Sequence, residues 1–148
     1  MVEICSRYGI LMKEHNADYL SDEAQQWHPR LGIHAANVAP EFGVTESRAL
    51  VDVLEANGQS PLCERFLQLA YDSKKWEKWM LPDSRASDRD RAIIAGHYVF
   101  ASEQCVALKA AAGRALEARG IDLEAHLQQQ VKNNILRYLR NFRLVRLV

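Results

Sequence analysis

Only two segments of this sequence have the pattern of buried β-strands, and both lie within its first 58 residues. The first covers about residues 9–15, and the second begins after Gly32 as Ile33-His34-Ala35-Ala36-Asn37-Val38. A helical pattern follows each strand, which is typical of βα units with parallel strands. A sheet of two strands leaves both edges unpaired and both faces uncovered, so we expect this region to be part of a larger sheet.

The helices of this region have recognisable ends. One is predicted to begin after Ser21, because serine can cap the first turn and acidic residues favour it. The next follows Pro40-Glu41-Phe42-Gly43 and is predicted to be capped by Thr45. It is expected to end near Asn57-Gly58. Its predicted buried stripe consists of Ala49, Leu50, Val53 and Leu54.

From Ser60 onward the pattern is helical throughout. Ser60-Pro61 is a cap followed by proline at the first helical position, and Ser87 with Asp90 has the spacing of a capping box. A long helix is predicted to end at Gly120 and the last one to begin at Asp122. The predicted buried stripes are Leu62, Phe66, Leu69 and Ala70, then Cys105, Leu108, Ala112 and Leu116, then Leu123, Leu127, Val131 and Ile135. Trp76 and Trp79 are interpreted as packing anchors.

The sequence therefore predicts an α/β protein that is mostly helical. Residues 1–58 form the βα region and residues 59–148 a helical extension. The composition agrees with a globular protein, since 48% of the 148 residues are hydrophobic and 26% are charged. No apolar run approaches the roughly 20 residues of a membrane-spanning helix, and Met1 to Arg7 lacks the apolar stretch of a signal peptide. We therefore expect a cytoplasmic protein.

The cysteines and the charges bear on possible partners. Cys5, Cys63 and Cys105 are too far apart for a CxxC metal site, so we expect free, buried thiols. Residues 131–148 contain no acid, and the rest of the chain carries a net charge of −5. A basic C-terminal helix can bind nucleic acid or an acidic partner. The simpler interpretation is a solvated helix face whose cations favour the helix C-terminus. These cations are Lys132, Arg137, Arg140, Arg143 and Arg146.

The first strand ends in a run of polar residues, Lys13-Glu14-His15-Asn16, with Asp18 shortly after. Strand alternation places Lys13 and His15 on one side and Glu14 on the other. Five polar side chains at the end of a strand suggest a site, provided that this end opens on a cleft. The remaining histidines are interpreted as structural or packing residues, and they are His28, His34, His97 and His126.

Several phrases of the sequence resemble one protein family. KEHNADYLSDEA, GIHAANVAPEFGV, WEKWM and the closing GID...RY pattern are similar to the C-terminal part of the Z-type, non-catalytic subunits of class II D-tagatose-1,6-bisphosphate aldolase. The likeness runs in the same order over nearly the whole chain. It implies a (β/α)8 TIM barrel with a helical extension, of which this chain would hold the last two βα units and that extension.

The resemblance also implies where a site would lie. TIM-barrel active sites lie at the carboxyl ends of the strands, and the loops after strands seven and eight often hold phosphate. In an intact barrel, the resemblance assigns His15 to the zinc that polarises the substrate carbonyl, and Asn37 to the phosphate. Backbone N–H groups of Gly43, Val44 and Thr45 could attract the same anion through a helix terminus.

Two features limit these assignments. A zinc site needs about three protein ligands, which two strands do not supply, so we expect no metal in this chain alone. A carboxylate beside a phosphate costs energy, which makes Glu41 an unfavourable neighbour unless it faces away or binds a cation.

The role implied by the resemblance is accessory. Such a subunit supports a separate catalytic subunit that cleaves tagatose bisphosphate into two triose phosphates, so we do not expect this chain alone to be an enzyme or to hold catalytic residues. The expected partners are the catalytic subunit or the remaining barrel segment, a second copy of the chain, and a sugar phosphate. The alternative is a helical module, residues 60–148, that binds a protein or nucleic acid through its basic helix. A kinase is not supported, because the sequence has no Walker-type phosphate-binding loop.

Overall fold

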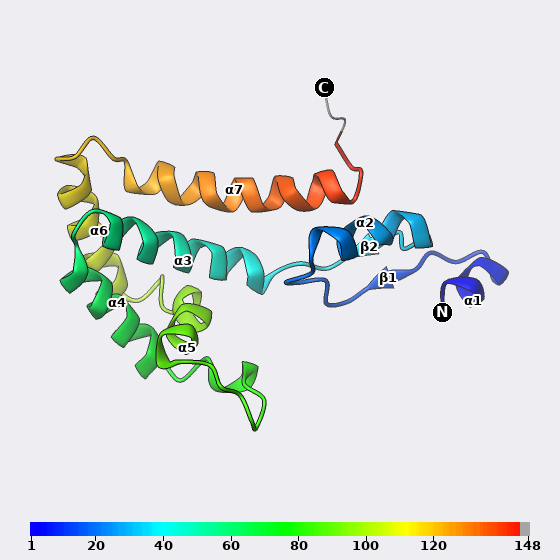
Figure 1. The fold of residues 1–148 in the computed structure, drawn as a ribbon, viewed down its shortest axis with the longest axis horizontal. Helices are drawn as coiled ribbons and strands as arrows, with labels where there is room; N and C mark the ends of the chain where they lie inside the picture. The colour runs from blue at the N-terminus through cyan, green and yellow to red at the C-terminus, as the bar shows by residue number, and fades with distance from the viewer. Residues whose placement is uncertain (146–148) are drawn as a thin grey trace. The chain divides into compact units, whose positions relative to one another are not determined.

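The computed structural model describes residues 1–145 of the protein. They form two compact units, the first built from Met1–Phe42 and the segment that begins at Lys132, and the second from Gly43–Val131. Helices α3 (Pro40–Ala56) and α7 (Leu123–Asn141) contribute residues to both units. Figure 1 labels the helices and strands along the chain. The predicted division into residues 1–58 and 59–148 follows the change of sequence pattern rather than these units, and it stays a prediction.

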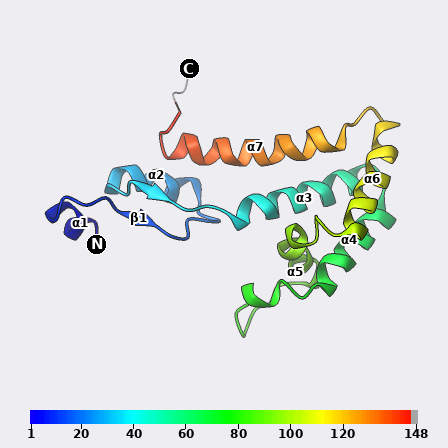
Figure 2. The ribbon, with the colours of Figure 1, turned by 180° about the vertical axis from the view of Figure 1, so that it is seen from behind.

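The first unit contains a small parallel sheet. Strand β1 (Lys13–Glu14) pairs with β2 (Ala35–Ala36), and their register places Lys13 opposite Ala35 and Glu14 opposite Ala36. Helix α1 (Val2–Arg7), which the sequence did not predict, precedes β1, and α2 (Asp22–Leu31) connects the two strands. Figure 2 shows α2 lying alongside them. The mostly helical α/β class and the parallel pairing are therefore confirmed, while two strands by themselves do not show a barrel.

Both strands are shorter than the predicted residues 9–15 and 33–38. Hydrogen bonding nevertheless continues past their formal ends, since His34 N donates to Met12 O at 2.9 Å and Asn37 N donates to Glu14 O at 3.1 Å. The carbonyl of Asn37 also accepts a bond of 3.0 Å from Ala17 N. Within residues 1–145 each strand has a neighbouring strand on one side only, so little holds the chain extended beyond this contact.

The interior of the first unit is polar, contrary to the predicted buried strands. Ile10 and Leu11 are 57% and 76% exposed, because no second layer covers this part of the chain in the described structure. The buried polar residues of this unit are Gln25, His28 and Glu41, whereas its buried hydrophobic residues in the range 1–145 are Ala17 and Tyr138. Hydrogen bonds rather than apolar packing therefore organise this unit.

The second unit has an apolar core, as predicted. Besides parts of α3 and α7, it contains α4 (Ser60–Asp72), η1 (Glu77–Trp79), α5 (Asp88–Ala95), η2 (Gly96–Tyr98) and α6 (Glu103–Glu117). The predicted stripes of α3 and α6 are buried in full, and within α4 Phe66 and Ala70 are buried while Leu62 and Leu69 are half-buried. The core residues are Val44, Ala49, Leu50, Val51, Val53, Leu54, Cys63, Phe66, Ala70, Ala92, Ile93, Val99, Cys105, Leu108, Ala112, Leu116, Leu123 and Leu127.

Three expectations about packing need correction. Trp76 is an anchor, since its ring stacks on Tyr71 with centroids 5.3 Å apart, but Trp79 is 44% exposed. Ile135 is also exposed, and it lies in the part of α7 that belongs to the first unit. Cys5 lies in a half-buried position, unlike the buried Cys63 and Cys105, and all three thiols are free.

The start of α3 also differs from the prediction. The helix begins at Pro40 rather than at a cap formed by Thr45. Oδ1 of Asp18 accepts hydrogen bonds from Ala39 N at 3.1 Å and from Glu41 N at 2.9 Å, which satisfies backbone groups at this terminus. The fixed φ of Pro40 suits the first helical position. Thr45 consequently lies inside the helix.

No helix within residues 1–145 is both long enough and apolar enough to cross a membrane.

Candidate functional site

The carboxyl ends of β1 and β2 are adjacent in the sheet, and each is followed by an exposed polar residue. His15 follows β1 directly and Asn37 follows β2 directly, and the backbone of Asn37 bonds to Glu14 on one side of His15 and to Ala17 on the other. His15 and Asn37 are both exposed. Their side chains, like that of Lys13, form no hydrogen bond or ion pair with any residue that the structure describes. An imidazole and an amide are thus open to a ligand at this edge.

Glu14 faces a different neighbour, the buried imidazole of His28. Nε2 of His28 contacts Oε2 of Glu14, while Nδ1 lies 3.1 Å from the carbonyl of Ala24. The two ring nitrogens of His28 thus contact one residue of α2 and one residue of β1. His28 therefore connects α2 to β1, in agreement with a structural role.

Glu41 lies at the centre of a buried hydrogen-bond network. Its Oε2 accepts from the hydroxyl of Tyr138 and from the backbone N–H of Tyr19. Its Oε1 accepts from Asn134 Nδ2 at 3.2 Å and from Arg137 Nη1 at 3.3 Å. Burial raises the pKa of the Tyr138 hydroxyl, and the hydrogen bond to Glu41 raises it further. The carboxylate that sequence analysis placed beside a possible phosphate is thus used within the fold.

Arg137 connects the same network to the start of α2. Its Nε donates to Asp22 Oδ1 at 2.5 Å and its Nη2 donates to the carbonyl of Leu20 at 2.7 Å. The hydrogen bond from Arg137 is the main reason why the pKa of the Asp22 carboxyl lies below its usual value. Asn141 joins the group by donating to Asp22 at 3.0 Å and to Gln25 at 2.9 Å. Arg137 is therefore a structural cation, whereas Arg146 lies outside the described residues.

The run after the first strand now divides into two groups. Glu14 and Asp18 have structural partners, His28 and the start of α3 respectively, and are not open to a ligand. Lys13, His15 and Asn16 remain exposed. Some of the polar residues after the first strand thus stabilise the fold, and the others lie on an exposed surface.

The other predicted phosphate residues lie in α3. Gly43, Val44 and Thr45 are the fourth to sixth residues of the helix, and they belong to the second unit while Asn37 belongs to the first. The N–H groups of Val44 and Thr45 lie past the first turn and bond within the helix, so the expectation of a helix terminus at these residues is wrong. Phosphate binding by Asn37, Gly43, Val44 or Thr45 stays a prediction.

The ligand set around His15 does not fit a zinc ion on its own. Within residues 1–145, no three His, Cys, Asp or Glu side chains lie close enough together to hold a metal ion. His15 would need at least two ligands from outside this chain to form a site of ordinary composition.

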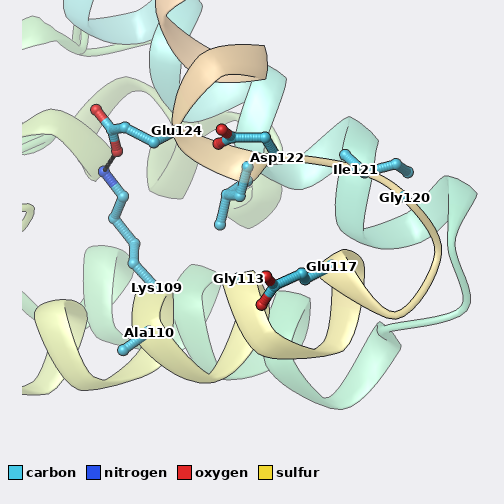
Figure 3. Close-up of a pocket in the computed structure, with 9 residues that line it drawn as sticks. Lys109, Ala110, Gly113, Glu117, Gly120, Ile121, Asp122 and Glu124 are labelled. Atoms are coloured by element: carbon cyan, nitrogen blue, oxygen red, sulfur yellow. Dashed lines mark hydrogen bonds and ion pairs between the residues drawn. The ribbon is translucent and has the colours of Figure 1, made fainter.

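Two surface grooves of the second unit carry charged side chains. One, of about 670 Å³, lies between α6 and the start of α7 and carries the carboxylates of Glu117, Asp122 and Glu124. Figure 3 shows Lys109 reaching Glu124, and their atoms Nζ and Oε2 are 3.5 Å apart. Asp122 caps α7 by accepting from Ala125 N at 3.0 Å. Lys109, Glu124 and Asp122 thus have partners within the fold, and an acidic rim by itself identifies no ligand.

The other groove, of about 560 Å³, lies between α3 and the start of α7. Thr45, one of the four residues predicted for phosphate, lines it together with Arg48 and His126. Sequence analysis interpreted His126 as structural and did not single out Arg48. The sequence indicates that Arg48 and His126 each lie in a helix. It does not indicate that the start of α7 approaches this face of α3.

No family model, curated protein or solved structure matches this chain.

Proposed function

We propose that this chain is the C-terminal part of a non-catalytic subunit of a class II tagatose-bisphosphate aldolase, and that it acts in cytoplasmic sugar-phosphate metabolism by stabilising a catalytic subunit. The observation that carries the proposal is the parallel pairing of two βα strands with His15 and Asn37 open at their adjacent carboxyl ends. The resemblance of the sequence phrases around these residues supplies the particular family.

The first unit exposes apolar side chains, which supports the proposal that another layer of protein structure covers them. Parallel sheets are normally covered on both faces, whereas Ile10 and Leu11 lie in the open before β1. Further exposed apolar side chains of this unit are Ile4, Tyr8, Tyr19, Trp27, Leu31 and Leu144. The rest of a barrel, the catalytic subunit or a second copy of the chain would bury such a surface. In such an assembly His15 would have access to additional metal ligands.

The alternative, a helical module that binds nucleic acid or protein through a basic helix, is less well supported. Arg137 is held by Asp22 and Glu41, so it is not available to a phosphate backbone. Lys132, Arg140 and Arg143 remain on the surface, which is the ordinary position of charged residues.

The proposal is tested by co-expression with the catalytic subunit of a class II tagatose-bisphosphate aldolase. We expect the two chains to elute together and the aldolase activity to survive longer on heating than that of the catalytic subunit alone. Leu11→Lys should abolish both effects, because it places a charge in the proposed contact. Leu81→Lys is the matched control, since Leu11 and Leu81 are 76% and 77% exposed and Leu81 lies in the second unit.

The control variant should behave like the unchanged chain. If the unchanged chain is folded by circular dichroism but neither co-elutes with the catalytic subunit nor prolongs its activity, the accessory function is wrong.

A further inference from the structure

The groove between α3 and the start of α7 is lined by three donor side chains that have no partner within the described part of the chain. Arg48, His126 and Gln130 line it, and their side chains form no hydrogen bond or ion pair with another residue in the described range. By contrast, Arg89, Arg91 and Arg137 each pair with a carboxylate. The complete lining is Thr45, Arg48, Ala49, Asp52, Val53, Ala56, Asn57, Ile121, His126 and Gln130.

Arg48 and Asp52 are one helical turn apart on α3, yet they form no ion pair. The negative charge of Asp52 is a minor cause of the raised pKa of Arg89, which is due mainly to the hydrogen bond from Arg89 to Glu55. Arg48 in turn exerts a small effect on Asp90, whose carboxyl is held mainly by Ser87. Arg48 and Asp52 therefore both remain able to interact with a third molecule in the groove.

The remaining lining is apolar and small. Ala49 and Val53 are buried beneath the groove, and Ala56 with Ile121 completes the apolar part. Binding sites for small molecules typically combine such an apolar base with a few convergent polar groups. A guanidinium presents paired N–H donors that match carboxylate or phosphate oxygens, and an imidazole has at least one N–H donor in either protonation state.

We propose that this groove binds a small hydroxylated organic anion. Its phosphate or carboxylate group lies against Arg48 and His126, a hydroxyl donates to Asp52, and its carbon skeleton covers Ala56 and Ile121. The side chains of Gln130 and Asn57 complete the polar contacts. This site belongs to the second unit alone, so it does not depend on the aldolase assignment or on His15 and Asn37.

Three compounds with the same carbon skeleton separate the chemical requirements. Glycerol has no charge, glycerate carries a carboxylate, and glycerol 3-phosphate carries a phosphate. In NMR titrations of the ¹⁵N-labelled full chain at constant ionic strength, we expect saturable shifts of the signals of Arg48, His126 and Gln130 with at least one of the two anions and not with glycerol. The anion that binds more tightly identifies the head group.

Arg48→Gln should weaken binding of that anion by about tenfold or more, since a hydrogen bond between charged groups is lost. Arg65→Gln is the matched control, because Arg65 is also an exposed helical arginine without an ion pair in the described structure and lies outside the groove. It should leave the affinity unchanged.

Circular dichroism should show the same fold for both variants. The proposal is overturned if neither anion gives saturable shifts, if glycerol binds as tightly as the anions, or if Arg48→Gln and Arg65→Gln have equal effects. Binding of a peptide without binding of either anion also contradicts it.

Discussion

At the scale of single residues, Glu41 is the shared acceptor of a hydrogen-bond network in the first unit. A buried carboxylate is costly unless donors surround it, and Glu41 receives bonds from Tyr138, Asn134, Arg137 and the backbone of Tyr19. Removing one donor from such a group costs more than the bond contributes, because the remaining partner stays buried and unsatisfied. Substitution of a single donor should therefore measurably lower the free energy of unfolding.

Tyr138→Phe should lower the free energy of unfolding by about 1–3 kcal/mol, since it removes the hydroxyl that donates to Glu41 and leaves the ring in place. Chemical denaturation followed by circular dichroism measures the change. Tyr98→Phe is the control, because Tyr98 is exposed and its hydroxyl has no hydrogen-bond partner in the described structure. Equal stabilities of the two variants would show that the Tyr138 hydroxyl contributes nothing.

The three thiols should differ in reactivity. Burial raises the pKa of Cys63 to about 11 and also raises the pKa of Cys105, so both are almost entirely unreactive thiols near neutral pH. Cys5 is half-buried and accessible. We expect iodoacetamide to modify one thiol quickly in the native protein and all three in denaturant, as counted by mass spectrometry. Cys5→Ser should remove the fast phase, and a native chain with three fast thiols would contradict the burial.

The raised pKa of Cys63 also predicts the direction of a pH effect on stability. The unfolded thiol ionises near its ordinary pKa of 9.0, whereas the folded thiol stays protonated until about 11. The stabilisation by the buried neutral thiol is therefore complete below pH 9.0 and is lost as the pH rises towards 11. Cys63→Ala should make the denaturation midpoint less dependent on pH in this range than it is for the unchanged chain.

At the scale of elements, close approach of helices depends on glycine at one point of the second unit. A Cβ added at Gly96 would lie 2.5 Å from Oγ of Ser47 and 2.8 Å from Cζ of Phe66. Ser47 and Phe66 are both fully buried and belong to α3 and α4, so neither can move without disturbing the core. Gly96 therefore allows η2 to pack against two helices at once.

Gly96→Ala should destabilise the protein by about 1–3 kcal/mol, the usual cost of overpacking a core. Gly113→Ala is the matched control, because Gly113 lies inside α6 and nothing lies within 4 Å of an added Cβ. It should stabilise the protein by up to about 1 kcal/mol, since alanine loses less backbone entropy in a helix. Thermal unfolding of both variants checks the opposite signs, and a stabilising Gly96→Ala would refute the close packing.

At the scale of the whole molecule, the two units differ in how they are stabilised. The second has an apolar core, whereas the first combines a polar interior with exposed apolar side chains. Burial of a large aliphatic side chain contributes about 1.5–3 kcal/mol, so exposed Ile10, Leu11 and their neighbours favour association. The unpaired edges of the two-stranded sheet also favour association, because they can pair with a strand of another molecule.

We expect the purified chain to self-associate, with a sedimentation coefficient that rises with concentration. Leu11→Lys should shift this equilibrium towards the monomer, whereas Leu81→Lys should not. A monomer at all concentrations that unfolds in one cooperative transition would show that the first unit needs no partner.

Local chemistry was sufficient to predict most helices. Ser21 and Ser87 cap α2 and α5 as expected, and Asp122, the predicted start of the last helix, caps α7; each accepts a bond from the N–H three residues later. The stripes of α3 and α6 were also correct. Caps and helical periodicity involve residues only a few positions apart, so the sequence alone determines them.

The adjacency of His15 and Asn37 was predictable for a similar reason. Two βα units imply parallel strands, and the carboxyl ends of parallel strands lie at the same edge of the sheet. Whether a ligand occupies this edge depends on surfaces that the two strands do not form.

Only the tertiary structure decided where α3 begins and what the first unit buries. Asp18 caps α3 from 21 and 23 residues away, and Tyr138 bonds to Glu41 across 97 residues. Composition rules place a glutamate on the surface, and no local pattern indicates partners so far along the chain. Burying Glu41 is favourable only once folding brings its donors together, whereas Ile10 and Leu11 stay exposed because the described fold brings nothing to cover them.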